Sequence, residues 1–249
     1  MNPKAETDWV VWHQAPDEAL ENRAAIHLWC CDLDDPRIVS FCDEAVLSED
    51  ERGIAARPCS PRQHALYVRR RSLRRVLLGR FLNLAPKDLK LARGDLGEPS
   101  EELVSAVRCH YSDSSSQNVF VLGATEGAAL GVDATPAMPE WDWTAVAEFM
   151  VGPEHLRELD RFPEAERQAV FLRFCSLREA VAKAFGHGIA EAAQEPVPDE
   201  SLWEAMIRPP SDPRPAELRE WRWEHRVVPS GTSYAVVCVA QRRRGCGEG

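Results

Sequence analysis

Residues 169–188 read AVFLRFCSLREAVAKAFGHG, and this stretch predicts one long amphipathic helix in the second half of the chain. Its apolar residues recur at the spacing of a single helical face, and the glycines that follow them are typical of a helix end. The face and the glycines comprise Val170, Phe174, Leu177, Val181, Phe185, Gly186 and Gly188. We expect this helix to be the main helix of that half.

A stretch 104 residues earlier resembles this helix. The offset aligns residues 65–68, ALYV, with AVFL, and residues 69–74, RRRSLR, with RFCSLR. The earlier stretch has an apolar face of its own, made by Leu66, Leu73, Leu77 and Phe81. A duplicated α+β unit explains the repeat economically, and chance similarity between two helices rich in alanine and arginine is the alternative.

Short runs rich in β-branched residues predict strands in both halves. These runs are Ile26–Trp29, Val119–Leu122, Ala129–Val132, Glu224–Val228 and Tyr234–Val237. Helices and strands together predict an α+β fold with two lobes. The predicted organisation is an N-terminal extension at 1–25, a first lobe at 26–135, a second lobe at 136–241 and a disordered tail at 242–249.

The overall charge and hydropathy exclude some classes of partner. The 249 residues carry a formal net charge of -10, which argues against nucleic acid because a duplex-binding surface needs many lysines and arginines. The start of the sequence has no apolar leader segment, and no apolar run approaches the length of a membrane-spanning helix, so we expect a cytoplasmic protein without a membrane partner. We also expect a monomer. A local basic cluster on the earlier helix is a candidate anion site, and its members are Arg69, Arg70, Arg71, Arg74, Arg75 and Arg80.

Four segments together resemble a known family. Leu96–Pro99 resembles a Gly-Lys-Pro motif, His110–Ser114 an Asn-x-Ser-His-Ser motif, Gly131–Thr135 a Gly-x-Asp-x-Glu motif and Cys175–Gly188 a Trp-x-x-Lys-Glu-Ala helix. Their order and spacing are similar to those of the large, two-lobed 4'-phosphopantetheinyl transferases of secondary metabolism. The resemblance implies pseudo-twofold, duplicated α/β lobes with the site in the cleft between them.

The resemblance also implies a reaction and a set of site residues. In this family a carrier-protein serine attacks the pyrophosphate of coenzyme A, and Mg²⁺ neutralises charge on its oxygens. Asp133 and Glu179 correspond to magnesium ligands, and Lys183 lies one helical turn beyond Glu179. The candidates for binding the nucleotide phosphates are Arg62, Arg70, Arg74 and Ser112.

Several positions depart from the family pattern. Asp113 replaces a phosphate-binding histidine, Glu98 a lysine and Thr135 a second strand carboxylate, while His110 replaces an asparagine and Cys175 a tryptophan. Two like charges about 4 Å apart cost on the order of 4 kcal/mol at an effective dielectric constant of 20. The two acids are therefore expected to disfavour a pyrophosphate in its usual position.

These departures leave three functions open. In the favoured hypothesis the cleft is repurposed, and His110, Asp113, Glu179 and Lys183 carry out acid–base chemistry, for example a cyclisation, without a metal or cofactor. The substrate would be a small or carrier-tethered intermediate of polyketide or non-ribosomal peptide biosynthesis. One alternative is a transferase that still uses Mg²⁺ and coenzyme A, with Asp113 as a metal ligand. The other is a non-catalytic module that binds an acyl or peptidyl carrier protein.

Structural explanations compete with these site roles. Glu179 and Lys183 have the spacing of an ordinary stabilising pair on an exposed helix. Asp133 lies at the end of a predicted strand, where an aspartate can cap a turn. His110 and Asp113 lie in a serine-rich stretch that is predicted to be a surface loop.

Overall fold

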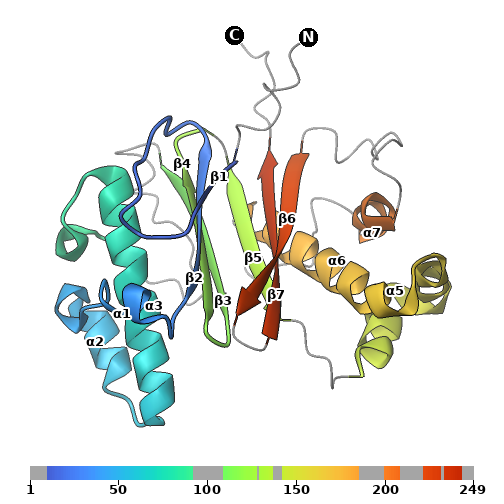
Figure 1. The fold of residues 1–249 in the computed structure, drawn as a ribbon, viewed down its shortest axis with the longest axis horizontal. Coiled ribbons are helices and arrows are strands. Elements are labelled where there is room, and N and C mark those ends of the chain that lie inside the picture. Colours follow the sequence, from blue (N-terminus) through green and yellow to red (C-terminus); the bar gives the residue numbers. More distant parts are fainter. Residues whose placement is uncertain are drawn as a thin grey trace. The chain divides into compact units, whose positions relative to one another are not determined.

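The computed structural model describes residues 10–91, 109–127, 129–136, 142–184, 199–207, 221–230 and 233–242. The chain divides into two compact units, Met1–Gly127 and Ala128–Gly249 (Figure 1). The predicted lobe boundary lay after residue 135. The structure divides the chain earlier because the strand at Leu130–Pro136 pairs with the last strand of the chain. Glu98, Phe185, Gly186, Gly188 and the tail beyond residue 242 lie outside the described residues.

Unit 1 contains a four-stranded sheet in the order β1-β2-β4-β3. The strands are β1 Val10–His13, β2 Ile26–Asp32, β3 His110–Ser116 and β4 Val119–Thr125. β1 is parallel to β2, while β2 and β3 are both antiparallel to β4. β1 lies within the stretch predicted to be an N-terminal extension, and its pairing with β2 makes it part of the unit.

The prediction of a loop at the serine-rich stretch is wrong, because residues 110–116 form β3. Serine is not a strong strand former, but pairing with a buried neighbour overrides that weak preference. Every residue of β3 pairs in register with one of β4, from His110 opposite Thr125 to Ser116 opposite Val119. All seven residues of β4 are buried, so β3 completes the edge of an apolar sheet.

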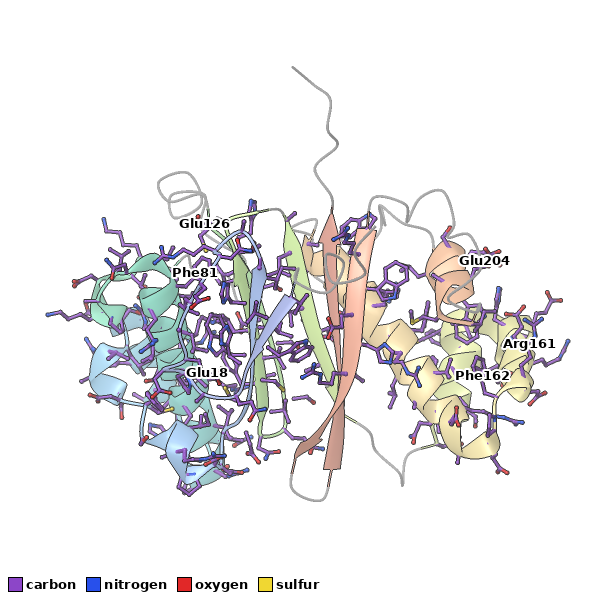
Figure 2. The ribbon with its side chains drawn as sticks, turned by 45° about the horizontal axis from the view of Figure 1, so that its top comes forward. Glu18, Phe81, Glu126, Arg161, Phe162 and Glu204 are labelled. Atoms are coloured by element: carbon purple, nitrogen blue, oxygen red, sulfur yellow. The ribbon has the colours of Figure 1, made fainter. Side chains whose placement is uncertain are left out.

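Helices cover one face of this sheet (Figure 1). They are α1 Pro36–Val39, η2 Glu44–Val46, α2 Glu49–Ala55, α3 Pro61–Leu82 and η3 Pro86–Asp88. α3 is the predicted first helix; it starts with a capping box between Ser60 and Gln63 and ends at Asn83, whose φ of 56° is left-handed. Its predicted apolar face packs in the core, where Figure 2 labels Phe81 between α3 and the sheet.

Unit 2 contains a three-stranded antiparallel sheet in the order β5-β7-β6. Its elements are β5 Leu130–Pro136, α5 Trp143–Glu158, η4 Leu159–Arg161, α6 Glu164–Ala184, α7 Asp199–Ile207, β6 Trp221–Ser230 and β7 Ser233–Arg242. α6 is the predicted main helix, and its buried residues Phe171, Phe174, Leu177 and Val181 form the core with Trp203 of α7. None of the described helices is long and apolar enough to cross a membrane.

The two units share one order of elements along the chain. In each unit a strand, β2 or β5, is followed by helices that include one long helix, α3 or α6, and then by a hairpin, β3–β4 or β6–β7, whose second strand pairs with that first strand. β1, which precedes β2 in unit 1, and α7, which follows α6 in unit 2, are departures from this shared order. β2 spans Ile26–Asp32 and β5 spans Leu130–Pro136, which is the same offset of 104 residues that aligns the two helices. This shared order agrees with the sequence repeat, and the duplication itself stays a prediction.

A buried pair of histidines links β1 to β2 in unit 1. Nε2 of His13 lies 2.8 Å from Nδ1 of His27, and Nδ1 of His13 lies 3.3 Å from Oε2 of Glu18. Both rings are almost fully buried, and the ring of His13 stacks on Trp29 with centroids 4.8 Å apart. Burial lowers the pKa of both histidines, and the neighbouring charge of His27 lowers the pKa of His13 further.

This pair makes the stability of unit 1 depend on pH. The unfolded histidines take up a proton near the ordinary pKa of 6.5, whereas the folded ones resist it. The free energy of unfolding should therefore be greatest above pH 6.5 and fall as the pH is lowered towards about pH 5. Urea unfolding across this range measures the slope, and His13→Gln with His27→Gln should flatten it. If the free energy of unfolding of the double variant falls with pH as steeply as that of wild type, the two histidines are not the source of the pH dependence.

Candidate functional site

The site in unit 2 depends on the close approach of α6 to β5. A Cβ atom added at Gly131 would lie 1.6 Å from the carbonyl oxygen of Ala180 and 2.8 Å from the backbone nitrogen of Ala184. Only a glycine therefore allows the helix to lie this close to the strand. Asp133 and Thr135 follow Gly131 at alternate positions, so all three residues lie on the face of β5 that α6 covers.

Hydrogen bonds from two elements hold the carboxylate of Asp133. Nζ of Lys183 on α6 donates to Oδ1 at 2.9 Å and to the carbonyl oxygen of Val132 at 3.1 Å. The hydroxyl of Thr135 donates to Oδ2 at 2.9 Å, and the hydroxyl of Ser176 on α6 donates to that of Thr135 at 2.7 Å. Ser176 is fully buried and Asp133 is buried, so these bonds lie inside the unit.

Glu179 adds a second carboxylate to this neighbourhood. Burial raises its pKa, and the charge of Asp133 raises it further, while Lys183 and Arg178 act in the opposite direction. On α6, Ser176, Glu179 and Lys183 share one helical face, because they are three and four residues apart. The thiol of Cys175 on the same helix has its pKa raised to about 12 by burial, so it is a neutral group near neutral pH.

The donor set of this cluster suits magnesium. Mg²⁺ prefers hard oxygen ligands and is commonly bound by one or two protein carboxylates, with water and substrate phosphate completing its shell. Asp133 and Glu179 supply two such carboxylates. Among the residues that the structure describes, no group of three or more His, Cys, Asp and Glu side chains could hold a metal. Two protein carboxylates, with water and a substrate phosphate as the remaining ligands, fit the usual pattern of a magnesium site.

In unit 1, Asp113 forms a buried ion pair with Arg74. Nη2 of Arg74 lies 2.6 Å from Oδ2 of Asp113, and the two side chains are only 10% and 8% exposed. Burial alone would lower the pKa of the Arg74 guanidinium, but the charge of Asp113 and the bond to it hold this pKa above its ordinary value. The negative charge of Asp113 is thus balanced within unit 1 by a permanent positive charge.

The strand β3 separates the two residues that were predicted to act together. Successive side chains of a strand point to opposite faces, so His110 and Asp113, three residues apart, lie on different faces. Asp113 shares its face with Tyr111, which packs in the core beneath α3, and His110 shares the other face with Ser112. The structure does not bring His110 and Asp113 into one acid–base group.

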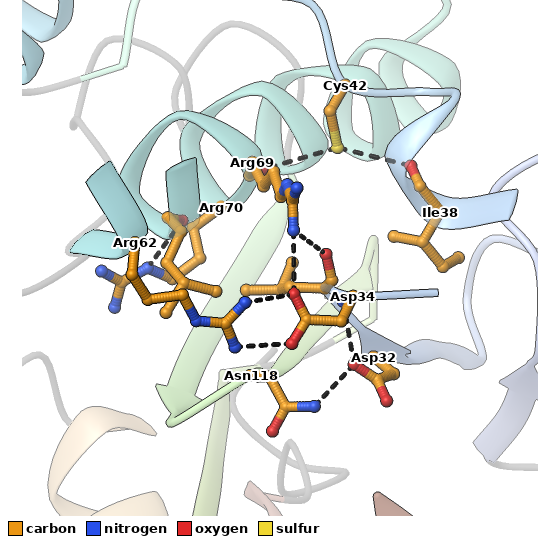
Figure 3. A network of polar contacts seen from close by, with 10 residues as sticks. Asp32, Asp34, Ile38, Cys42, Arg62, Arg69, Arg70 and Asn118 are labelled. Carbon is orange, nitrogen blue, oxygen red and sulfur yellow. Dashed lines mark hydrogen bonds and ion pairs between the residues drawn. The ribbon is translucent and has the colours of Figure 1, made fainter. Parts of the chain in front are cut away.

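The other predicted phosphate-binding arginines have partners of their own. Both terminal nitrogens of Arg62 bond the carboxylate of Asp34, which also accepts from Arg69 at 2.9 Å (Figure 3). Nη1 of Arg70 donates to the hydroxyl of Ser115 at 2.9 Å, and burial together with the charges of Arg71 and Arg74 lowers its pKa. Arg62 links the start of α3 to the turn that follows β2. The side chain of Arg70 extends from α3 to β3, near the Arg74–Asp113 pair.

The structure brings six of the predicted residues together within the units, three in unit 1 and three in unit 2. Arg70, Arg74 and Asp113 lie together in unit 1, and Asp133, Glu179 and Lys183 lie together in unit 2. Gly131 and Ser176 were not predicted as individual site residues. A glycine inside a predicted strand, and a serine on the same helical face as Glu179 and Lys183, are the signals that could have identified them.

The Arg74–Asp113 pair should contribute strongly to the stability of unit 1. Asp113→Asn leaves a buried guanidinium without a negative partner, and we expect it to lower the free energy of unfolding by about 3 kcal/mol. Denaturant unfolding measures the change. As a control, Asp160→Asn breaks the exposed pair with Arg167, at 2.9 Å, and should cost less than about 1 kcal/mol. Equal effects in the two variants would contradict a role for burial.

Comparison with known proteins identifies relatives over most of the chain. No family model matches. The chain is 27% identical over 197 residues to slr0495 of Synechocystis sp., named as a candidate 4'-phosphopantetheinyl transferase, with 78% of this chain and 77% of the relative covered. It is 28% identical over 181 residues to the 4'-phosphopantetheinyl transferase HetI of Nostoc sp., with 72% of this chain and 76% of the relative covered.

Proposed function

We propose that this chain, a member of the 4'-phosphopantetheinyl transferase superfamily, moves the phosphopantetheine arm of coenzyme A to a serine of a carrier protein with the help of Mg²⁺. One observation carries the proposal. β5 and α6 bring two carboxylates, Asp133 and Glu179, and the ammonium of Lys183 into one cluster. Two carboxylates and a cation are the groups that such a transfer needs.

Asp133 and Glu179 are the residues that would hold the metal. When bound, Mg²⁺ would supply positive charge that neutralises the phosphate oxygens of the substrate. Burial, and after it the charge of Asp133, raise the pKa of Glu179, and a divalent cation bound by the two carboxylates would offset both effects. Thr135, in the position of a further carboxylate in the family pattern, contributes a hydroxyl that orients Asp133.

The reaction breaks the phosphoanhydride bond of the coenzyme A pyrophosphate and forms a phosphodiester bond to the carrier-protein serine. The serine oxygen of the carrier protein bonds to phosphorus as the bond between that phosphorus and the departing 3',5'-adenosine diphosphate breaks. The serine proton must pass to a base, such as a water molecule or a carboxylate oxygen beside the cluster. The ammonium of Lys183 lies 2.9 Å from Oδ1 of Asp133, where its positive charge stabilises negative charge on the groups of the cluster.

The ion pair in unit 1 weakens the electrostatic objection to pyrophosphate binding. The repulsion predicted from the sequence assumes that the charge of Asp113 is uncompensated, but Arg74 contacts Asp113 directly at 2.6 Å. The estimated repulsion therefore does not apply in full to Asp113. This balance favours phosphopantetheinyl transfer over a repurposed acid–base pocket, and the relatives give no support to cyclisation chemistry.

A loading assay tests the proposal. The protein is incubated with coenzyme A, Mg²⁺ and an apo carrier protein, and the carrier is weighed by intact-protein mass spectrometry. We expect a mass gain of one phosphopantetheine arm that disappears when a chelator removes Mg²⁺. If neither acyl nor peptidyl carrier proteins gain this mass, while a known transferase loads the same carriers, the proposal is wrong.

A further inference from the structure

We infer that Ser176 and Thr135 form a positioning relay that fixes the carboxylate of Asp133 for a divalent cation. The inference rests on the proposed function, because it assigns a task to two residues of the same cluster. Neither residue has a charge, and neither is a metal ligand in this account. Their hydroxyls form a continuous chain of bonds, 2.7 Å from Ser176 to Thr135 and 2.9 Å from Thr135 to Asp133.

The chemistry of the groups fixes the direction of this chain. An ionised carboxylate can only accept hydrogen bonds, so the hydroxyl hydrogen of Thr135 must point to Oδ2 of Asp133. The oxygen of Thr135 then accepts the hydrogen of Ser176. The hydrogen bond that Thr135 accepts from Ser176 disfavours turning the Thr135 hydrogen towards Ser176, so this hydrogen stays directed at Asp133.

The relay and Lys183 together hold both oxygens of the carboxylate. Lys183 donates to Oδ1 from α6, and Thr135 donates to Oδ2 from β5. A carboxylate whose plane is already fixed loses little conformational freedom when a metal binds. Removing a residue that hydrogen-bonds a metal ligand typically lowers metal affinity about 10- to 100-fold. Since Thr135 replaces a carboxylate of the family pattern, the relay orients Asp133 without adding a third negative charge beside Glu179.

The relay can be tested with the metal alone. Mn²⁺ is a hard cation with ligand preferences close to those of Mg²⁺, and electron paramagnetic resonance measures its free concentration during a titration. We expect Thr135→Val to weaken Mn²⁺ binding about 10-fold, while Thr135→Ser, which keeps the hydroxyl, restores it. Ser176→Ala should also weaken binding, and it should have no further effect in the Thr135→Val background because it acts only through Thr135.

Unit 1 offers a matched control. Ser72 is the counterpart of Ser176 at the offset of 104 residues, and it is also a fully buried serine of a long helix. Its hydroxyl accepts a hydrogen bond from the backbone N–H of Asp43 at 2.7 Å, so Ser72→Ala also removes a buried bond. We expect Ser72→Ala to leave Mn²⁺ affinity unchanged.

The outcomes separate this inference from the proposed function. If the wild-type protein binds Mn²⁺ and loads carriers, but Thr135→Val and Ser176→Ala bind the metal as tightly as wild type, the relay alone is overturned. If the wild-type protein loads carriers yet binds no Mn²⁺ without coenzyme A, there is no preformed cation site to position and the relay is again overturned. If neither loading nor Mn²⁺ binding occurs, the proposed function fails together with the inference. The relay is supported if Thr135→Val and Ser176→Ala both bind Mn²⁺ more weakly than wild type, Thr135→Ser restores binding and Ser72→Ala has no effect.

Discussion

Gly131→Ala is expected to destroy the folded state of unit 2. The added Cβ would lie 1.6 Å from the carbonyl oxygen of Ala180, and this contact partner belongs to the backbone of α6, so no side-chain rotation can relieve the overlap. α6 must then move away from β5, and the core that α6 forms with α7 loses its packing. We expect a loss of more than about 4 kcal/mol, which thermal unfolding followed by circular dichroism would detect.

Gly53→Ala is the matched control for this prediction. Gly53 lies in α2, and a Cβ at this position would meet nothing within 4 Å. Alanine in an unstrained helix position stabilises a protein by about 0.4–1 kcal/mol, so this variant should unfold at the wild-type temperature or slightly above it. A Gly131→Ala protein that unfolds like wild type would show that α6 does not lie against β5 as described.

Glu179→Gln is expected to have the largest effect on catalysis. It keeps the shape of the side chain but removes one of the two negative charges that would hold the cation. A bound metal supplies several kcal/mol of charge stabilisation in the transition state, so we expect kcat/KM for carrier loading to fall about 10²- to 10³-fold. The rate of carrier mass gain at several Mg²⁺ concentrations provides the measurement.

Glu166→Gln provides the corresponding control on the same helix. Glu166 is an exposed residue of the first turn of α6, outside the cluster around Asp133. We expect it to load carriers at the wild-type rate. Wild-type kcat/KM in Glu179→Gln, with an unchanged requirement for Mg²⁺, would remove Glu179 from the metal site.

Helical periodicity predicted the two elements that matter most for the fold. α3 and α6 bury apolar residues at the spacing seen in the sequence, and the five predicted strand runs all fall at β2, β4, β5, β6 and β7. This success has a physical basis, because a long helix must bury one apolar stripe and that stripe is local in the sequence. β1 is short, and β3 is rich in serine, so their local patterns did not indicate strands.

The sequence predicted the site residues of unit 2 better than those of unit 1. Asp133, Glu179 and Lys183 could be identified because a strand and a helical face carry them at recognisable spacings. The partner of Asp113 could not be identified, because Arg74 lies 39 residues away in the chain and belongs to a row of arginines with similar local surroundings. Because residues 110–116 were predicted to be a loop, the alternation of side chains along a strand could not be applied to them. The placement of His110 and Asp113 on opposite faces was therefore not predicted.

Titration calorimetry with coenzyme A, with and without Mg²⁺, tests the central claim most directly. The claim is that Asp133 and Glu179 form a cation site that serves a pyrophosphate substrate, with Asp113 balanced by Arg74. We predict that coenzyme A binds in the presence of Mg²⁺ and that binding weakens strongly when the metal is withheld or Glu179 is replaced by glutamine. A protein that is folded but releases no heat with coenzyme A under either condition would contradict the account.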